Sequence, residues 1–300
     1  MRYSYGPGYT IPLPGRHAFP MGKYEALYRI LCDEGLIVLE EGYEPYEADW
    51  ADLRLVHTPE YLKSLEEDSL GPAARRKLGL PFSDVLLERA RLAVQGTIAA
   101  ARFALSDGVG ANLAGGTHHA FPDHGEGYCL LNDVAVAVRV LERSGQVRRV
   151  LIVDLDVHQG NGTAAIFSDD ASIFTLSIHG ENNYPWTKSK SSLDVSLPDG
   201  TGDRGYLEAL GESLNLAIGR SVPDLIFYLA GVDPVVGDRF GRLALTLEGL
   251  GSRDRYVLTS ARRYGIPIVM VPAGGYAPTP ELTADLHAVV HREWRAVLSH

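Results

Sequence analysis

Three side chains that could bind a metal follow an apolar run near the middle of the sequence. Asp154, Asp156 and His158 alternate with apolar residues directly after the run 150–153. Alternate residues of an extended segment point to the same side, so the three side chains can converge on one pocket. Carboxylate oxygens and a neutral imidazole nitrogen suit a divalent metal, zinc first. A strand end with solvated acids and an incidental histidine has the same pattern, so other segments must decide.

Two adjacent histidines, His118 and His119, follow a second apolar stretch at residues 110–114. On irregular backbone both rings can face a cleft, where each needs an acceptor that fixes which ring nitrogen carries the proton. Such a pair could perform acid–base catalysis. A pair of surface histidines is the alternative, and for this motif taken alone it is the more common one.

A third apolar run, residues 224–230, is followed by Asp233. With Asp156 and His158, Asp233 would complete a set of two carboxylates and one imidazole. Such a set leaves a position open for water and substrate, as catalytic zinc sites do. An aspartate before Pro234 also marks many ordinary turns.

The motif Gly274-Gly275-Tyr276 follows a fourth apolar run, residues 266–272. Paired glycines after a strand allow the backbone to approach a ligand closely and turn a side chain inward. The phenol of Tyr276 could then donate a hydrogen bond to a polarised carbonyl. On its own, the motif is more often an ordinary loop.

All four motifs lie directly after predicted strands, which is where open parallel sheets bind their ligands. Helical patterns alternate with the strands, and their starts carry capping residues or a proline in the first turn. The expected helices span residues 84–105, 134–141, 203–219, 247–264 and 280 onward, and a further strand spans 172–178. The sequence therefore predicts an α/β fold with three αβα layers and a central, mostly parallel sheet.

From the segment 16–23 to Gly274-Gly275-Tyr276, the sequence resembles the histone deacetylases and their bacterial relatives in the arginase–deacetylase superfamily. The motif 154–162, Asp-Leu-Asp-Val-His-Gln-Gly-Asn-Gly, and the segment 230–239 are most similar to the class IV branch of that family. The resemblance implies the arginase/deacetylase fold. It also implies one catalytic zinc ion, held by Asp156, His158 and Asp233.

The same resemblance implies roles for the other polar residues of the motifs. His118 and His119 would form the catalytic pair, with His119 as the base, and Tyr276 would be the electrophilic partner. Asp154 would support His118 instead of binding zinc. Asn161 stands where class I members carry an aspartate, which favours a neutral His119 that can act as a base.

A substrate tunnel and a potassium site are also implied by the resemblance. Gly127 and Tyr128 match the segment that walls the acyl tunnel, and Tyr184 is expected on the opposite wall. Phe240 could line the rim of the tunnel, but ordinary core packing is the expectation for this residue. Lys23 falls where many relatives carry an arginine beside the product-release pocket. Gly274 and Gly275 are the further tunnel residues, and the residues expected around a structural potassium ion are Asp154, Asp156, His158, Ser177 and Ile178.

Composition agrees with a cytoplasmic enzyme. The 300 residues are 45% hydrophobic and no linker or low-complexity run divides them, so we expect one domain. The net charge of −10 argues against nucleic-acid binding, which needs clustered lysine and arginine. Cys32 and Cys129 give no disulfide framework, and no apolar stretch is long enough for a membrane span or a signal peptide.

Three functions fit parts of this pattern. We expect a zinc amidohydrolase that removes acetyl or longer fatty acyl groups from lysine side chains of peptides or proteins, or from acylated polyamines. A binuclear manganese ureohydrolase of the arginase type would need a second acid at position 160, where the sequence has Gly160. A non-catalytic binder of acyl-lysine would have no need for the ligands, the base and Tyr276, which are all present.

Overall fold

The computed structural model describes residues 1–15 and 17–299; Arg16, which begins the segment that resembles the family, lies outside the described residues. One eight-stranded sheet runs through this part of the chain, and its neighbouring strands are all parallel, in the order β2-β1-β3-β8-β7-β4-β5-β6. The strands are β1 (Tyr3–Ser4), β2 (Gly42–Tyr43), β3 (Val109–Asn112), β4 (Val150–Asp154), β5 (Ile173–Gly180), β6 (Leu193–Leu197), β7 (Leu225–Ala230) and β8 (Ile268–Pro272).

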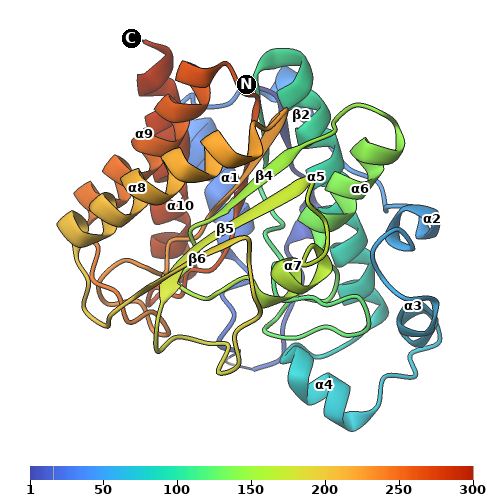
Figure 1. The fold of residues 1–300 in the computed structure, drawn as a ribbon. Helices are drawn as coiled ribbons and strands as arrows, with labels where there is room; N and C mark the ends of the chain where they lie inside the picture. The colour runs from blue at the N-terminus through green and yellow to red at the C-terminus, as the bar shows by residue number, and fades with distance from the viewer. Residues whose placement is uncertain (16, 300) are drawn as a thin grey trace.

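Helices cover both faces of the sheet, which gives the three predicted layers (Figure 1). Helices α5 and α6 lie on one face, and α1, α8, α9 and α10 lie on the other. The helices are α1 (Lys23–Asp33), α2 (Trp50–Leu53), α3 (Pro59–Glu66), α4 (Pro72–Leu78), α5 (Asp84–Asp107), α6 (Asp133–Arg143), α7 (Asn161–Ile166), α8 (Asp203–Ser221), α9 (Leu247–Tyr264) and α10 (Pro280–Leu298). No helix among the described residues has both the length and the apolarity to cross a membrane.

Strand β7 shows why these segments form a sheet that is buried on both sides. Phe227 packs into the core under α5 and α6, whereas the next residue, Tyr228, packs into the core under α8 and α9. All six residues of the strand are buried. Because successive side chains of a strand point to opposite faces, such a strand appears in the sequence as a continuous apolar run.

The α/β fold and the positions of the long helices confirm the prediction from the sequence. The capping side chains of Ser83, Asn132 and Thr279 each accept a hydrogen bond from a backbone N–H of the first helical turn, at 3.0 to 3.2 Å. The sequence analysis did not predict the short elements β1, β2, β6, α1, α2, α4 and α7. Their runs are too short for a clear periodicity, and β6 alternates between half-buried and exposed positions at the sheet edge.

The order of the strands brings the four motifs together. β3, β8, β7 and β4 are consecutive neighbours in the middle of the sheet, and each is followed by one of the motifs. Because the strands are parallel, their carboxyl ends lie at one edge, so the loops after them share a single crevice.

A fully buried arginine fixes two of these loops. Arg253 on α9 donates from Nη1 to the carbonyl oxygens of Leu155 at 3.2 Å and Gly231 at 2.6 Å, and its charge is balanced by Asp254. Those carbonyls belong to the loops after β4 and β7, just ahead of Asp156 and Asp233. One side chain therefore holds the two loops at a fixed separation.

We expect Arg253→Leu to lower the free energy of unfolding by about 3–5 kcal/mol, because it leaves the buried Asp254 carboxylate without a counter-charge. Chemical denaturation measures this loss. The double variant Arg253→Leu/Asp254→Asn should lose less than the single one, because no unpaired charge remains.

Arg255→Leu is the matched control, since this arginine lies on the same helix but pairs with Glu293 at the surface. It should cost at most about 1 kcal/mol. Equal losses for Arg253→Leu and Arg255→Leu would contradict the role assigned to the buried arginine.

Candidate active site

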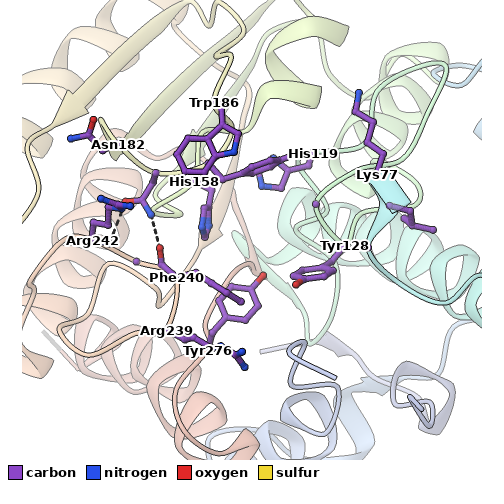
Figure 2. Close-up of a pocket in the computed structure, with 16 residues that line it drawn as sticks. Lys77, His119, Tyr128, His158, Asn182, Trp186, Arg239, Phe240, Arg242 and Tyr276 are labelled. Atoms are coloured by element: carbon purple, nitrogen blue, oxygen red, sulfur yellow. Dashed lines mark hydrogen bonds between the residues drawn. The ribbon is translucent and has the colours of Figure 1, made fainter. Parts of the chain in front are cut away.

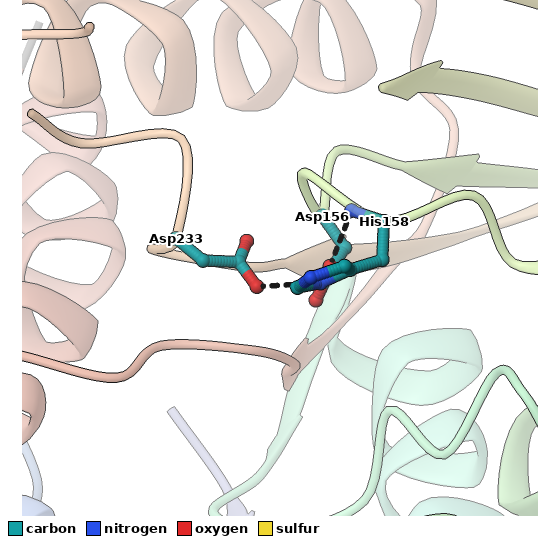
Figure 3. Close-up of side chains that lie close together, drawn as sticks. All are labelled: Asp156, His158 and Asp233. Atoms are coloured by element: carbon teal, nitrogen blue, oxygen red, sulfur yellow. Dashed lines mark hydrogen bonds and ion pairs between the residues drawn. The ribbon is translucent and has the colours of Figure 1, made fainter. Parts of the chain in front are cut away.

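Asp156, His158 and Asp233 meet at the carboxyl ends of β4 and β7. One ligand atom from each lies within 4.8 Å of the other two, and all three residues are buried (Figure 3). Asp156 Oδ1 accepts hydrogen bonds from the backbone N–H of His158 and from its Nδ1, at 2.8 and 2.9 Å. The structure therefore brings together the three residues that the sequence analysis expected around zinc.

The donor set fits a divalent cation. Asp233 Oδ1 accepts a hydrogen bond from the Val157 N–H at 2.8 Å, whereas Asp233 Oδ2 is buried, lies 3.1 Å from His158 Nδ1 and has no hydrogen-bond partner. A buried carboxylate oxygen without a partner is costly unless a cation or a donor satisfies it. Two carboxylates and one imidazole are the ligand types of catalytic zinc sites with an open position.

The electrostatics of the cluster point the same way. Burial and the neighbouring charge of Asp156 raise the pKa of Asp233 to about 7. Burial lowers the pKa of His158, but the hydrogen bonds and charges of Asp156 and Asp233 outweigh it and raise this pKa to about 10. The cluster thus attracts positive charge strongly, and a bound metal ion can neutralise the carboxylates as a proton can.

Position 274 requires glycine because the chain passes directly over the cluster. A Cβ atom there would lie 1.9 Å from Asp233 Oδ2 and 2.6 Å from Asp156 Oδ2. The Gly274 N–H also donates a hydrogen bond to Asp156 Oδ2. This is the close backbone approach that the paired glycines predicted.

His118 is hydrogen-bonded to the carboxylate of Asp154. Its Nδ1 lies 2.7 Å from Asp154 Oδ2, and Asp154 Oδ1 accepts a hydrogen bond from the Asp156 N–H at 3.1 Å. Burial lowers the pKa of His118, but the charges of Asp154 and Asp156 outweigh it and raise this pKa to about 9. Asp154 therefore touches the first histidine and the backbone of the cluster, as the resemblance implied.

His119 is bound to an amide. Its Nδ1 lies 2.7 Å from Asn161 Oδ1, and Asn161 Nδ2 donates to Glu126 Oε1 at 2.6 Å. Because the Glu126 carboxylate only accepts hydrogen bonds, the amide must turn its NH₂ to Glu126 and its oxygen to His119. The proton of the neutral His119 ring is then on Nδ1, which leaves Nε2 as an acceptor.

The two histidines consequently differ in charge although they are adjacent. Burial and the charges of His118 and His158 hold the pKa of His119 well below its ordinary value. The ring centroids of His118 and His119 are 4.1 Å apart, so the charge on one ring acts directly on the other. A charged ring thus lies beside a neutral one that can accept a proton.

Glu126 is a further residue of the site and was not predicted from the sequence. This residue is 4% exposed, accepts a hydrogen bond from the Tyr184 hydroxyl at 2.8 Å and pairs with Lys77 at 2.7 Å. Burial raises the pKa of Glu126, but hydrogen bonds from Lys77, Asn161 and Tyr184 outweigh it and lower this pKa. An acid between two glycines in the wall segment, Gly125-Glu126-Gly127, is the signal that could have found it.

A cavity of about 510 Å³ leads from the surface to His119 and His158 (Figure 2). Gly127, Tyr128 and Tyr184 line it, as expected. Tyr128 adopts a left-handed backbone conformation, φ 69°, which is uncommon for an aromatic residue and typical of a functional loop. The Tyr184 ring lies edge-on to His119, with centroids 5.0 Å apart.

The prediction that Phe240 packs in the core is wrong. Phe240 is half-buried, lines the cavity and packs edge-on against Tyr276 with ring centroids 4.8 Å apart. It follows a turn in which Asp238 Oδ1 accepts hydrogen bonds from the N–H groups of Phe240 and Gly241. This turn directs the ring toward the opening, which the local sequence does not reveal.

Tyr276 enters the same cavity from the loop after β8. Its ring centroid lies 6.3 Å from that of His158, and its N–H donates to Asp238 Oδ2 at 2.6 Å. Burial and the charges of Asp156 and Asp233 raise the pKa of Tyr276 well above its ordinary value, so the phenol keeps its proton. Gly275 does not face the cavity, since a Cβ at this residue would point at Val232 and Thr283.

Lys23 is buried near the cluster. It is 1% exposed and donates from Nζ to the Ala273 carbonyl at 2.7 Å. Burial lowers the pKa of Lys23 to about 8, although the charges of Asp233 and Asp156 oppose this shift. A buried lysine is therefore close enough to the cluster for its charge to interact with both acids, at the position where many relatives carry an arginine.

Two further predictions concern residues beside the cluster. Ser177 is the direct partner of Asp154 in the pairing of β4 with β5, and Ile178 follows it on the same strand.

At position 160, a Cβ atom would lie 2.3 Å from Asp154 Oδ2, so a larger residue has no room. The second acid of a binuclear site therefore could not stand there without rebuilding the loop.

Comparison with known proteins gives a consistent result. The histone deacetylase domain model matches residues 17–292. An uncharacterized protein of Picosynechococcus is 46% identical to this chain, with 98% of both chains covered. Histone deacetylase 2 of Arabidopsis thaliana is 33% identical, with 91% of this chain and 73% of the relative covered.

A probable deacetylase of Archaeoglobus fulgidus is 32% identical, with 78% of this chain and 68% of the relative covered. The matched residues include all four motif loops and the strands that precede them. Given this coverage, together with the parallel αβα fold and the clustered motifs, the chain belongs to the histone deacetylase family.

Proposed function

We propose that this protein is a zinc-dependent deacylase. It removes acetyl or longer fatty acyl groups from lysine side chains, or from related acylated amines, by attack of water on the amide. The observation that carries this proposal is the cluster of Asp156, His158 and Asp233 at the inner end of a cavity that also contains His119 and Tyr276. Relatives named as deacetylases support the removal of acetyl groups.

Asp156, His158 and Asp233 would hold the zinc ion. When bound, zinc supplies Lewis acidity that polarises the amide carbonyl and makes water a better nucleophile near neutral pH. The aromatic rings of Tyr128 and Tyr184 both line the cavity, and such rings suit the alkyl stem of an acyl-lysine side chain. The scissile amide would thereby reach the residues at the inner end.

His119 takes the proton from the attacking water. The hydrogen bond from its Nδ1 to Asn161 leaves Nε2 free to accept, and the low pKa of the ring keeps it neutral. His118, held by Asp154, keeps positive charge beside the site and supplies a proton to the leaving amine. The Tyr276 hydroxyl donates a hydrogen bond to the oxyanion that forms from the amide carbonyl.

Two finer assignments stay predictions. The class IV subgroup rests on the motif 154–162 and the segment 230–239. The structural potassium ion rests on the resemblance, with Asp154, Asp156, His158, Ser177 and Ile178 as its expected neighbours. Nothing in the geometry favours the manganese ureohydrolase, because position 160 has no space for the acid that its second metal needs.

Chelation followed by dialysis should abolish hydrolysis of an acetyl-lysine peptide, and one equivalent of zinc should restore it. Metal analysis of the active protein should find one zinc ion per chain. Rates on acetyl-lysine, longer acyl-lysine and acetylated polyamine substrates, compared side by side, test the breadth of the activity. Unchanged rates after metal removal, or two manganese ions per active chain, would reject the proposal.

Tyr276→Phe should lower kcat by about 10²–10³, because it removes one donor to the oxyanion. Zinc content should not change, since the phenol is not a ligand. Tyr264→Phe, at an exposed position on α9, is the matched control and should keep full activity. A Tyr276→Phe enzyme as active as the parent protein would show that another group stabilises the oxyanion.

Glu126→Gln should lower kcat by about tenfold, less than the full contribution of a general base, about 10²–10⁴-fold, because the base itself is still present. A glutamine at 126 can donate as well as accept, so the Asn161 amide is free to turn its NH₂ to His119 and select the other tautomer. The pH profile of kcat/KM should change on the limb assigned to the base. Glu88→Gln, an exposed control on α5, should change neither quantity; a Glu126→Gln variant with the parent profile would exclude this positioning role.

A further inference from the structure

The outer part of the cavity is positively charged, although the chain as a whole is acidic. The sequence has 38 acidic and 28 basic residues, yet the cavity is lined by Lys77, Arg239 and Arg242 and by no aspartate or glutamate among the described residues. These cations come from α4 and from the loop between β7 and α9, and they lie around the opening in Figure 2. Positively charged side chains at the mouth favour anionic partners.

The three cations differ in how much of their charge is available. Lys77 pairs with the buried Glu126 at 2.7 Å, and Arg242 pairs with Asp199 at 3.2 Å. Arg239 forms no ion pair within the part of the chain that the structure describes. Its guanidinium instead lies 5.3 Å from the centre of the Phe240 ring, a contact that orients the group without neutralising it.

Arg239 is also held in place at the backbone. Its N–H donates to the Tyr276 carbonyl at 3.3 Å, so it is attached to the loop that carries the phenol. The acid next to it, Asp238, is occupied by the backbone N–H groups of Phe240, Gly241 and Tyr276. Both oxygens of the adjacent carboxylate therefore accept hydrogen bonds that shape the loop.

The side chain of Arg239 borders two hollows. It lines the 510 Å³ cavity that leads to His158 and a neighbouring cavity of about 440 Å³ that is bounded by residues 17–21. If the acylated side chain of a substrate fills the first cavity, the rest of the substrate lies at the mouth, next to Arg239. Trp186, 79% exposed at the same mouth, offers a flat apolar surface for that body.

We propose that the site selects acyl-lysine peptides that carry aspartate or glutamate next to the acylated lysine, and that Arg239 binds those carboxylates. The proposal rests on the deacylase function proposed above and narrows its substrate class. A guanidinium presents two parallel N–H groups to a carboxylate, which gives both attraction and orientation. Acetylated polyamines carry positive charge in place of the carboxylates and are disfavoured.

The experiment compares acetyl-lysine peptides of one length that differ only in the two flanking residues, which are Asp, Asn or Lys. We expect kcat/KM at low salt to be about fivefold higher for the Asp peptide than for the Asn peptide, the upper size expected for an exposed charge pair. The Lys peptide and an acetylated polyamine should be slower than the Asn peptide. Sodium chloride at about 0.5 M should reduce the differences by screening.

Variants identify the residue responsible. Arg239→Gln should bring the ratio of Asp to Asn peptides close to one, and Arg239→Glu should make the Lys peptide the better substrate. Arg102→Gln removes an exposed arginine from α5, far along the chain from the opening loops, and should leave the ratio unchanged. Comparing Nε-acetyl-lysine with its α-amide separates a flanking carboxylate from the α-carboxylate of the lysine itself.

The outcomes separate this proposal from the proposed function. Equal rates for the three peptides, or a preference for Lys flanks in the parent protein, would overturn the selection of acidic substrates while leaving the deacylase function intact. If no amide is hydrolysed, fluorescence anisotropy of the same labelled peptides on the zinc-loaded protein decides. Tighter binding of the Asp peptide that Arg239→Glu reverses would support the inference, and equal binding would reject it.

Discussion

The structure depends on keeping two buried carboxylates close together. Asp156 and Asp233 are both fully buried, and their ligand atoms lie within 4.8 Å of each other and of His158. Like charges in a poorly solvated interior repel, so this arrangement needs positive charge among the carboxylates. Arg253 holds the backbone carbonyls that precede both acids, and the charge of the buried Lys23 interacts with both carboxylates. The fold thus keeps the two carboxylates of a cation-binding site together although their negative charges repel each other.

The two histidines above this site show how neighbouring rings acquire different chemistry. His118 faces the carboxylate of Asp154 and retains a proton, whereas His119 faces the amide of Asn161 and stays neutral. The negative charge of Glu126 lies on the far side of Asn161 from His119. Glu126 accepts a hydrogen bond from the Asn161 amide and so fixes its orientation, while the His119 ring stays neutral. The difference between an acid and a base is therefore made by the partners, because each partner decides which protonation state is stable.

Charge also changes sign along the cavity. Behind its inner end, the acids Asp156 and Asp233 lie beside His158, and its mouth contains Arg239 without a carboxylate partner in the described part of the chain. In the function proposed for this protein, the aromatic walls would accommodate the neutral amide and alkyl stem of an acylated side chain, and the rest of the substrate would stay at the cationic rim. Different residues would then bind the acyl group and recognise the molecule that carries it.

The sequence by itself determined the four strand-and-loop motifs, the metal-binding residue types and the capped helices. These features depend on alternation, on helical periodicity and on capping chemistry, which act between residues close together in the chain. Only the tertiary structure decided that Glu126 reaches Asn161, that Arg253 holds two loops, and that Phe240 and Arg239 face the opening. These contacts join segments that fold together from distant parts of the chain, and no local pattern encodes which side chains will meet.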